Sequence, residues 1–502
     1  MTDPSGPPDG VQFPLVDGRR STSATGRAVV AAAAAAVDPD LAARVTGTRD
    51  WHTGYVDRLR ELVTAELTAP VADEAVPRRG LAEVYATFGY HRGGTAVPLA
   101  EAAGLPARTE LTTAAVDGRG APSRELTVPH AGRELSGDAL RRQLETWERA
   151  GVLEPSAAEA VRTVLAEPDW LDLSDQTVVV LGAAAEMGPL AHLLRWGATV
   201  VPVDLARPRV WERVLGAVRD GTGRALVPVR HPVATDDHAA LAVVAGADLD
   251  TELPEVAAWL GGLDAVDTVG TYVYADGADN VRVSLAADVL TTGVLARHPD
   301  AVLAGLLTPT DVYAAPPETA EAARAGAAGR HGAARLTRAA TRGRGFRPHY
   351  GDTITTPGGA RFGLADAQVL QQGPNYALAK RLAQWRFRVA RADGTRVSAN
   401  VAPATSTRSV TSNRLLAAAY AGAHHFGVEV FHPDTSTALM GALLVHDLRA
   451  PAAVGNPDRD LTHPLGLFAA TAAHGGLWRM PWLPRSVLPL AAARGLPSSL
   501  RR

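Results

Sequence analysis

Residues 176–204 read QTVVVLGAAAEMGPLAHLLRWGATVVPVD, and this stretch decides the fold. It opens with Gln176–Leu181, an apolar run typical of a strand buried on both faces of a parallel sheet. A turn that begins and ends with glycine, 182–188, leads into a helical pattern. Residues 198–203 then form a second apolar strand, and Asp204 follows directly. Strand, glycine turn, helix, strand and terminal acid predict a βαβ unit.

The glycine turn offers what a phosphate-bearing ligand needs. Gly182 permits a tight turn, Gly188 lets the backbone approach a phosphate, and the following helix presents free N–H groups. Asp204 can accept hydrogen bonds from ribose hydroxyls. Glu186 stands where the three-glycine fingerprint has another glycine. The unit therefore predicts a nucleotide-like ligand, either a dinucleotide or the adenosyl group of a methyltransferase cofactor.

Strand and helix patterns alternate after this unit. Two stretches compete for the third strand, 224–229 and 241–249, and apolar runs at 263–273 and 301–307 predict two more strands. This alternation predicts a Rossmann-like α/β fold, in which a doubly wound, mostly parallel sheet carries helices on both faces. Ligands bind such a sheet at the carboxyl ends of its strands.

The length of 502 residues favours two or three folding units. We expect a mainly helical N-terminal accessory domain over residues 1–170 and a Rossmann-like catalytic domain over residues 171–450. Residues 314–372 break the alternation and are interpreted as an insertion, part helix and part loop, before the helix that contains Tyr376. Residues 451–502 form a C-terminal extension.

Composition excludes several function classes. The chain has no cysteine, which excludes disulfides and thiolate chemistry, and its histidines lack ligand spacing, so we expect no metal site. A net charge of −3 gives no electrostatic footprint for nucleic acid. No leader pattern and no apolar run of bilayer length are found, which predicts a cytoplasmic protein without stable membrane insertion. The Ala-, Gly- and Arg-rich usage is typical of a GC-rich bacterial genome.

Lys380 is the only lysine, since 49 of the 50 Lys and Arg residues are arginine. A single retained ammonium indicates a position that a guanidinium cannot serve, although a chance surface lysine is the alternative. Tyr376 lies four residues earlier, one helical turn away on the same face. A phenol and an ammonium so placed form an acid/base pair, in which the cation is expected to lower the tyrosine pKa.

Four features now stand in one order along the chain. They are the glycine turn 182–188, Asp204, the helical motif Tyr376-x-x-x-Lys380, and Arg396-Val-x-x-Asn400-Val-x-Pro403 on the next strand. This ordered set resembles the short-chain dehydrogenase/reductase superfamily. The resemblance runs from about residue 176 to about residue 448, with the insertion as an interruption.

The resemblance implies an NAD(P)-dependent oxidoreductase that transfers a hydride between nicotinamide and a carbonyl or alcohol substrate. It assigns Tyr376 as the general acid/base and Lys380 as the residue that binds the nicotinamide ribose. We also expect a homo-oligomer. Long flanking segments near the strand ends can build a lid, which favours a substrate bulkier than a small alcohol.

The same resemblance implies where the cofactor binds. Asp204 would bind the adenosine ribose and favour NAD over NADP, although Arg207 and Arg209 leave NADP open; Asp248 would lie near the adenine. The cofactor-binding residues so implied are Gly182, Glu186, Met187, Gly188, Asp204, Asp248, Lys380, Pro403, Thr405 and Thr407.

One family residue is missing. No serine exists between Ser284 and Ser398, so the family's catalytic serine has no counterpart in its expected place. Thr308 or Thr310, at the end of the fifth predicted strand, can supply the hydroxyl that orients a substrate carbonyl. The competing candidates, all within the insertion, are Thr353, Thr355 and Thr356.

Two other functions remain open from the sequence. An S-adenosylmethionine-dependent methyltransferase-like enzyme would use the same glycine turn and Asp204, but it gives no role to Tyr376 and Lys380. A catalytically inactive nucleotide-binding subunit is the third hypothesis, and the missing serine favours it.

Overall fold

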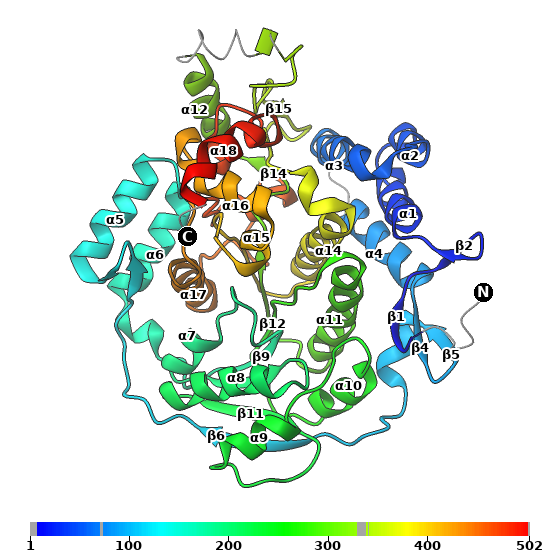
Figure 1. Cartoon of the computed structure of the whole chain (residues 1–502), viewed down its shortest axis with the longest axis vertical. Coiled ribbons are helices and arrows are strands. Elements are labelled where there is room, and N and C mark those ends of the chain that lie inside the picture. The colour runs from blue at the N-terminus through cyan, green and yellow to red at the C-terminus, as the bar shows by residue number, and fades with distance from the viewer. Residues whose placement is uncertain (1–7, 71–73, 329–337, 340, 500–502) are drawn as a thin grey trace.

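The computed structural model describes residues 8–70, 74–328, 338–339 and 341–499 (Figure 1). Its centre is a seven-stranded sheet with the order β17-β13-β12-β9-β10-β11-β6. The strands are β6 (Thr112–Asp117), β9 (Thr177–Leu181), β10 (Thr199–Val203), β11 (Arg224–Val229), β12 (Thr268–Thr271), β13 (Val302–Leu307) and β17 (Val397–Val401). The six that follow β6 are parallel and take the spatial order 3-2-1-4-5-6 of a dinucleotide-binding sheet. The predicted Rossmann-like fold class is confirmed.

The sheet is buried on both faces because its strands are apolar throughout. In β9, Val179 and Leu181 belong to one hydrophobic core, whereas Val178 and Val180 belong to the other. Successive side chains of a strand point to opposite faces, so a continuous apolar run requires a helical layer on each side.

Helices form those two layers (Figure 1). One face packs against α10 (Leu253–Gly261), α11 (Gly277–Arg297) and α14 (Gly373–Ala392), with α1 (Thr22–Ala35), α3 (Trp51–Thr68) and α4 (Ala75–Thr87) outside them. The other face packs against α7 (Leu190–Arg195), α8 (Pro208–Asp220), α9 (His238–Val244) and α17 (Pro433–Arg449), with α5 (Gly137–Arg149) and α6 (Pro155–Ala166) outside them.

The N-terminal segment wraps around the sheet. Helices α1, α3 and α4 share the core of one face, and α5 and α6 share the core of the other. Between them, β6 pairs antiparallel with β11, from Thr112 opposite Val229 to Asp117 opposite Arg224. Figure 1 shows this connection running below the sheet from one helical layer to the other. No sequence pattern indicated the edge strand, and the boundary at residue 170 stays a prediction.

The structure resolves one ambiguity and corrects one interpretation. The third strand is β11, and the competing stretch 241–249 begins within α9. In the insertion, β14 (Val312–Ala315), β16 (Arg361–Asp366) and β15 (Ile354–Thr355) form an antiparallel sheet beside α12 (Pro317–Ala328). The interpretation of 314–372 as helix and loop alone is therefore wrong. The strands pair across a long sequence separation, which no local pattern reveals.

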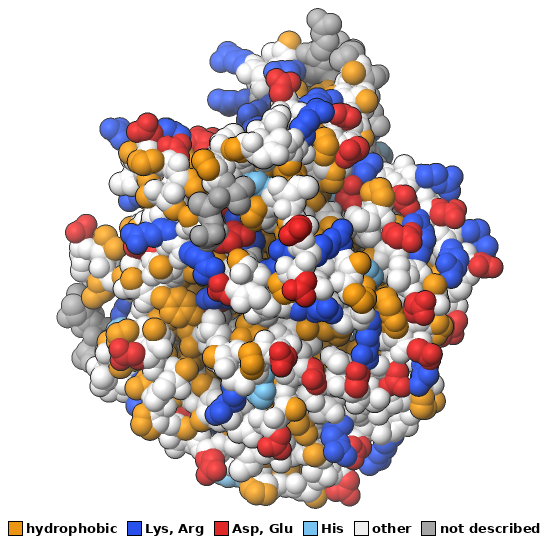
Figure 2. Space-filling view, turned by 180° about the vertical axis from the view of Figure 1, so that it is seen from behind, with side chains coloured by type: hydrophobic (Ala, Val, Ile, Leu, Met, Phe, Trp, Pro, Cys, Tyr) orange, Lys and Arg blue, Asp and Glu red, His pale blue; other side chains and the backbone are white. Residues whose placement is uncertain are grey.

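Small elements complete the described chain. They are β1 (Gly10–Gln12), β2 (Leu15–Val16), β3 (Arg19–Arg20), β4 (Gly89–Arg92), β5 (Thr95–Pro98), β7 (Val128–His130), β8 (Arg133–Leu135), α2 (Pro39–Thr46), α15 (Arg408–Thr411), α16 (Arg414–Ala421), α18 (Pro484–Ser499), and the 3₁₀ helices η1 (Leu99–Gly104), η2 (Pro168–Leu171), η3 (Leu370–Gln372), η4 (Ala423–Phe426), η5 (Pro464–Phe468) and η6 (Leu477–Arg479). Among the described residues, no helix combines the length and apolarity needed to cross a bilayer. Acidic and basic side chains are interspersed on the face seen in Figure 2.

Candidate active site

The glycine turn lies where the strand order reverses, between β9 and β12. Gly182 has a φ of +83°, and a Cβ there would come within 3.0 Å of the backbone of Tyr272 and Val273. Both the conformation and the close approach therefore require glycine. A Cβ at Gly188 would lie 3.2 Å from the Ala185 carbonyl oxygen, which is a milder constraint. The reversal point is the usual crevice for a ligand in such a sheet.

Asp204 lies beside this turn at the carboxyl end of β10. One carboxylate oxygen accepts the Ala184 N–H at 2.8 Å, and the other accepts the Leu205 N–H at 2.8 Å. Burial raises the pKa of Asp204, while the two N–H groups and nearby arginines act in the opposite direction. The carboxylate thus holds the turn in place. Each oxygen keeps a second lone pair that can accept a hydrogen bond from a ribose hydroxyl. Ribose binding itself stays a prediction.

Glu186 is exposed and turns away from the glycine turn. Its carboxylate accepts the backbone N–H of Arg408, the first residue of α15, at 2.8 Å. The backbone N–H groups of Glu186 and Met187 donate to no acceptor in the described part of the chain. These two N–H groups are therefore available to a ligand. The Glu186 carboxylate, which interrupts the glycine fingerprint, is bound to the Arg408 N–H instead.

The other predicted cofactor residues are found on two loops. The Ala247 N–H donates to the Asp204 carbonyl, so Asp248 lies next to the end of β10. One oxygen of Asp248 accepts the backbone N–H groups of Asp250 and Thr251, at 2.9 and 3.3 Å. It stabilises the turn before α10, and contact with adenine stays a prediction.

The loop after β17 contains the remaining three. Thr405 is buried, donates to the Pro403 carbonyl at 2.9 Å and lies 2.7 Å from the Ser436 hydroxyl. Thr407 is the N-cap residue of α15 and lies 3.0 Å from the Ser409 hydroxyl. Because Arg408 contacts Glu186, this loop is connected to the glycine turn.

Tyr376 and Lys380 lie on α14 as the sequence predicts, and both are partly buried. The helix begins at Gly373, whose φ is +77°, so Tyr376 is in its first turn. The Lys380 ammonium lies 5.5 Å from the centroid of the Tyr376 ring. Burial lowers the pKa of Lys380 to about 8.

Two threonines face the phenol from the end of β13. The Thr308 and Thr310 hydroxyls lie 2.8 Å apart, and Thr310 accepts a hydrogen bond from Gln372 Nε2 at 2.7 Å. Burial raises the pKa of Tyr376 above its ordinary value, while hydrogen bonds to Thr308 and Thr310 act in the opposite direction. Two threonine hydroxyls therefore lie next to the phenol, and their role in place of a serine stays a prediction.

The competing threonines lie within the insertion. Thr355 is exposed on β15, Thr353 accepts a hydrogen bond from Arg361 at 3.0 Å, and Thr356 accepts the Ala360 N–H at 3.1 Å. None of the three contributes to the pKa of Tyr376. The structure therefore brings Thr308 and Thr310, and not these residues, to the phenol.

The prediction that the pKa of Tyr376 is lowered is wrong: its pKa is raised, and Lys380 is not among the groups that shift it. No hydrogen bond joins the two side chains within the described structure, and the ammonium lies over the ring. A cation over an aromatic face is attracted to the ring electrons, not to the phenolic oxygen. Burial consequently dominates, and the tyrosine pKa is raised.

Two further tyrosines next to Tyr376 were missed by sequence analysis. Tyr274, in the loop after β12, meets it edge-on with ring centroids 6.5 Å apart and donates to Asp276 at 2.9 Å. The pKa of Tyr420, on α16, is raised by burial and by Tyr376. These residues come from separate elements with no shared motif, so no sequence signal could have grouped them.

An apolar pocket of about 680 Å³ opens beside this cluster. Thr310, Gln372 and Tyr420 provide its polar groups. The rest of its lining is apolar and comes from the segment between β16 and η3, the loop after β17, α15, α16, η4 and the residues after it, η6 and the residue after it, and α18. We refer to this space as the apolar pocket. No sequence pattern indicated the apolar pocket, beyond the expectation that flanking segments can cover the strand ends.

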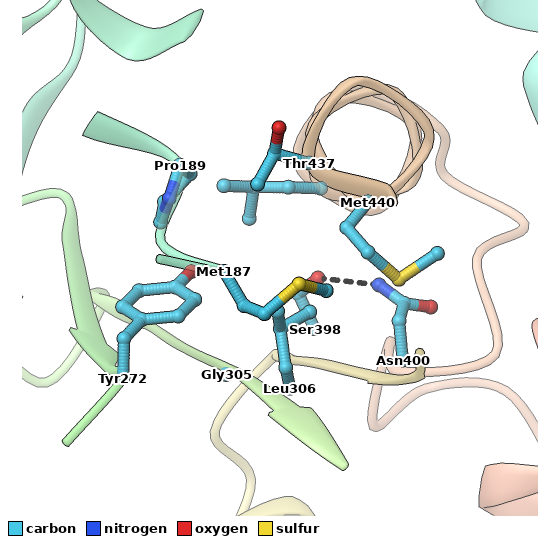
Figure 3. Close-up of a pocket in the computed structure, with 10 residues that line it drawn as sticks. Met187, Pro189, Tyr272, Gly305, Leu306, Ser398, Asn400, Thr437 and Met440 are labelled. Carbon is cyan, nitrogen blue, oxygen red and sulfur yellow. Dashed lines mark hydrogen bonds between the residues drawn. The ribbon is translucent and has the colours of Figure 1, made fainter. Parts of the chain in front are cut away.

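A smaller pocket of about 260 Å³ lies between α17 and the ends of β13 and β17 (Figure 3). Met187 and Met440 extend into it from opposite sides, above Ser398 and Asn400. The buried carboxylate of Asp447, on α17, accepts hydrogen bonds from Ser398 Oγ at 2.8 Å and from Asn400 Nδ2 at 2.9 Å. Asn400 belongs to the predicted strand motif, but its partner Asp447 was missed because nothing in the helical pattern marks it.

Comparison with known proteins adds little. No family model and no curated protein match this chain. Among the solved structures that match are a 3-oxoacyl-[acyl-carrier protein] reductase from Brucella melitensis, 15% identical, and a thiolation-reductase di-domain from an archaeal non-ribosomal peptide synthetase, 14% identical, each with a TM-score of 0.28. The matches cover 53% and 59% of this chain, and 82% and 70% of those chains. Likeness at this level carries no argument about function.

Proposed function

We propose that this protein is a nicotinamide-dependent oxidoreductase acting on a carbonyl or alcohol group, of the short-chain dehydrogenase/reductase type. The observation that carries the proposal is the convergence of two hydroxyls and one ammonium on the Tyr376 side chain, from Thr308, Thr310 and Lys380. A phenol that exchanges a proton and a hydroxyl that orients the substrate oxygen are the groups such a reaction needs.

Each group has a task in carbonyl reduction. The Tyr376 hydroxyl donates its proton to the substrate oxygen as negative charge develops there. Thr308 donates a second hydrogen bond that fixes the oxygen, and Thr310 and Gln372 orient Thr308. The raised pKa of Tyr376 keeps the phenol protonated at neutral pH, which suits an acid. Nicotinamide, when bound, supplies or accepts the hydride.

The residues around the glycine turn fit a dinucleotide. Gly182 allows close approach of the backbone, and the N–H groups of Glu186 and Met187 are free to bind phosphate. NAD is favoured, because a 2′-phosphate would meet the Asp204 carboxylate. We assign Gly182, Glu186, Met187 and Gly188 to the pyrophosphate, Asp204 and Asp248 to adenosine, and Lys380, Pro403, Thr405 and Thr407 to the nicotinamide half.

Replacement of one hydroxyl tests the proposal. Tyr376→Phe should lower turnover by about 10²–10⁴-fold, since proton transfer is lost, and leave NAD(H) affinity in calorimetry nearly unchanged. Tyr274→Phe is the matched control, because it removes the neighbouring phenol and should keep most of the activity. Near-normal turnover of Tyr376→Phe would refute the assignment.

Lys380→Arg is a second test, in which charge is kept and only shape changes. We expect it to lose activity, because a planar fork cannot replace a compact ammonium in this space. Calorimetric titrations with NAD(H), NADP(H) and S-adenosylmethionine separate the remaining functions. Binding of S-adenosylmethionine, without binding of either dinucleotide, would favour a methyltransferase. Dinucleotide binding without redox activity would favour a non-catalytic subunit.

A further inference from the structure

We infer that the substrate is an uncharged ketone or secondary alcohol with a long hydrocarbon body, which fills the apolar pocket while its oxygen lies at Tyr376. This inference rests on the proposed function and specifies its substrate class. It starts from the polar groups of the apolar pocket, where Thr310 is hydrogen-bonded to Thr308 and Gln372. Thr310 therefore belongs to the pocket lining and also contacts the candidate proton donor Tyr376.

The lining of the apolar pocket determines which molecules it accepts. None of its lining residues is charged, and apolar side chains such as Leu416, Phe426, Met480 and Val487 form most of the wall. Burying a carboxylate or ammonium there without a partner would cost far more free energy than burying a hydrocarbon chain of equal size. The polar groups contributed by Thr310, Gln372 and Tyr420 suit one oxygen-bearing group.

The wall formed by α16 and α18 is closely packed, because the two helices touch backbone to backbone. A Cβ at Gly422 would collide with the Ala491 carbonyl, and a Cβ at Gly495 would collide with the Ala418 carbonyl. Figure 1 shows the two helices together above α15 and α14. Such a wall is a preformed feature of the fold, as small-molecule sites usually are.

Another part of the lining places the predicted nicotinamide region next to the same space. Ala404, directly after Pro403, lines the apolar pocket together with Val428 and Val430. A ketone whose oxygen reaches the threonines therefore has its carbonyl carbon near the loop assigned to nicotinamide. Its hydrocarbon body then extends toward α18.

A homologous ketone series measures the occupancy of the apolar pocket. With unbranched 2-ketones from butan-2-one to decan-2-one, kcat/KM should rise about fourfold for each added methylene until the pocket is full. Decan-2-one should exceed 9-oxodecanoate, its carboxylate-ended equivalent, by at least about 10²-fold. Equal values along the series, or equal values for this pair, would overturn the inference.

Two adjacent leucines on α16 provide matched variants. Leu416 lines the apolar pocket, whereas Leu415 is 46% exposed. In Leu416→Trp, kcat/KM should stop rising at a shorter ketone than in the wild type. In Leu415→Trp, the dependence of kcat/KM on chain length should match that of the wild type. Leu416→Ala, which enlarges the space, should extend the gain to longer ketones and serves if the tryptophan variant does not fold. Identical series for all variants would refute the pocket assignment.

Binding of decan-2-one without cofactor separates this inference from the proposed function. Calorimetric binding that is lost in Leu416→Trp, in a protein that reduces no ketone, supports the apolar pocket and overturns the oxidoreductase proposal. Ketone reduction without chain-length dependence keeps the oxidoreductase proposal and overturns the substrate class.

Discussion

The Glu186 carboxylate accepts the backbone N–H of Arg408 at 2.8 Å, and this contact joins the glycine turn to the start of α15. The N–H groups at a helix start have no partner within the helix, so the carboxylate satisfies one of them. The contact also connects the loop after β17 with the turn that follows β9. The residue that interrupts the glycine fingerprint therefore has a structural partner far along the chain.

Glu186→Gln should strengthen dinucleotide binding. The amide oxygen can still accept the Arg408 N–H, but the negative charge near the pyrophosphate is removed. At an exposed position this repulsion is modest, so we expect the Kd for NAD to fall about 2–5-fold in calorimetry. Glu212→Gln, at an exposed acid on α8, is the control and should leave the Kd as it is. A weaker complex of Glu186→Gln would show that the carboxylate assists binding.

Thr308 should matter more than Thr310 because Thr310 is already engaged by Gln372. Thr308→Val should lower kcat about 10²-fold, and Thr308→Ser should restore most of it. The lost hydrogen bond also raises the pKa of Tyr376 further. The rise of alcohol oxidation with pH should therefore move upward by about 0.5–1 pH unit.

The control for this experiment is Thr355→Val, at one of the competing threonines. It should retain both the wild-type rate and the wild-type pH profile. If Thr355→Val is the variant that loses activity, the insertion supplies the hydroxyl and the assignment of Thr308 is refuted.

Lys380→Met should stabilise the fold while it abolishes turnover. Burial lowers the pKa of Lys380 from 10.5 to about 8, so the charged form is disfavoured in the folded state. Below pH 8 this cost is present in full, and it vanishes as the pH rises to about 10.5. Urea unfolding should therefore give a gain on the order of 3 kcal/mol at pH 7 that fades above pH 8. A variant less stable than the wild type at pH 7 would contradict this account.

Buried Glu154 should determine part of the acid stability. It accepts hydrogen bonds from His474 Nε2 at 2.9 Å, from Arg479 at 2.9 and 3.1 Å, and from Thr319. His474 Nδ1 accepts the Gly476 N–H, so its proton is on Nε2. Burial raises the pKa of Glu154, but the hydrogen bonds from His474 and Arg479 outweigh it and lower the pKa to about 2.

Because the folded pKa of Glu154 lies below its ordinary 4.5, the stabilisation is complete above pH 4.5 and is lost as the pH falls toward 2. Glu154→Gln should lose about 3 kcal/mol at pH 7 and show a flatter decline in acid, measured by urea unfolding. Glu159→Gln, at an exposed acid of the same helix, is the control and should change stability by less than about 0.5 kcal/mol. Equal effects of the two variants would refute the role of the buried network.

The predictable part of the site consists of residues close together in sequence. The glycine turn after β9, Asp204 after β10 and the Tyr376–Lys380 pair on α14 each lie within one element or one turn, where periodicity and spacing determine geometry. The direction of the Tyr376 pKa shift was not predictable, because burial depends on neighbours from other elements. That Thr308, and not Thr355, lies next to the phenol was unpredictable for the same reason, because it depends on how separate elements pack.

Local periodicity and backbone sterics specify the apolar strands, the glycine turn and the spacing that places Tyr376 and Lys380 on one helix, so these features could be predicted from the sequence alone. The folded structure was needed to show that β6 forms the sheet edge, that Asp204 accepts the Ala184 N–H, that Glu154 is hydrogen-bonded to His474, and that α16 and α18 line an apolar pocket near Tyr376. These relationships join segments that are distant along the chain. They arise from the packing of whole elements onto the two faces of one sheet, which no local pattern encodes.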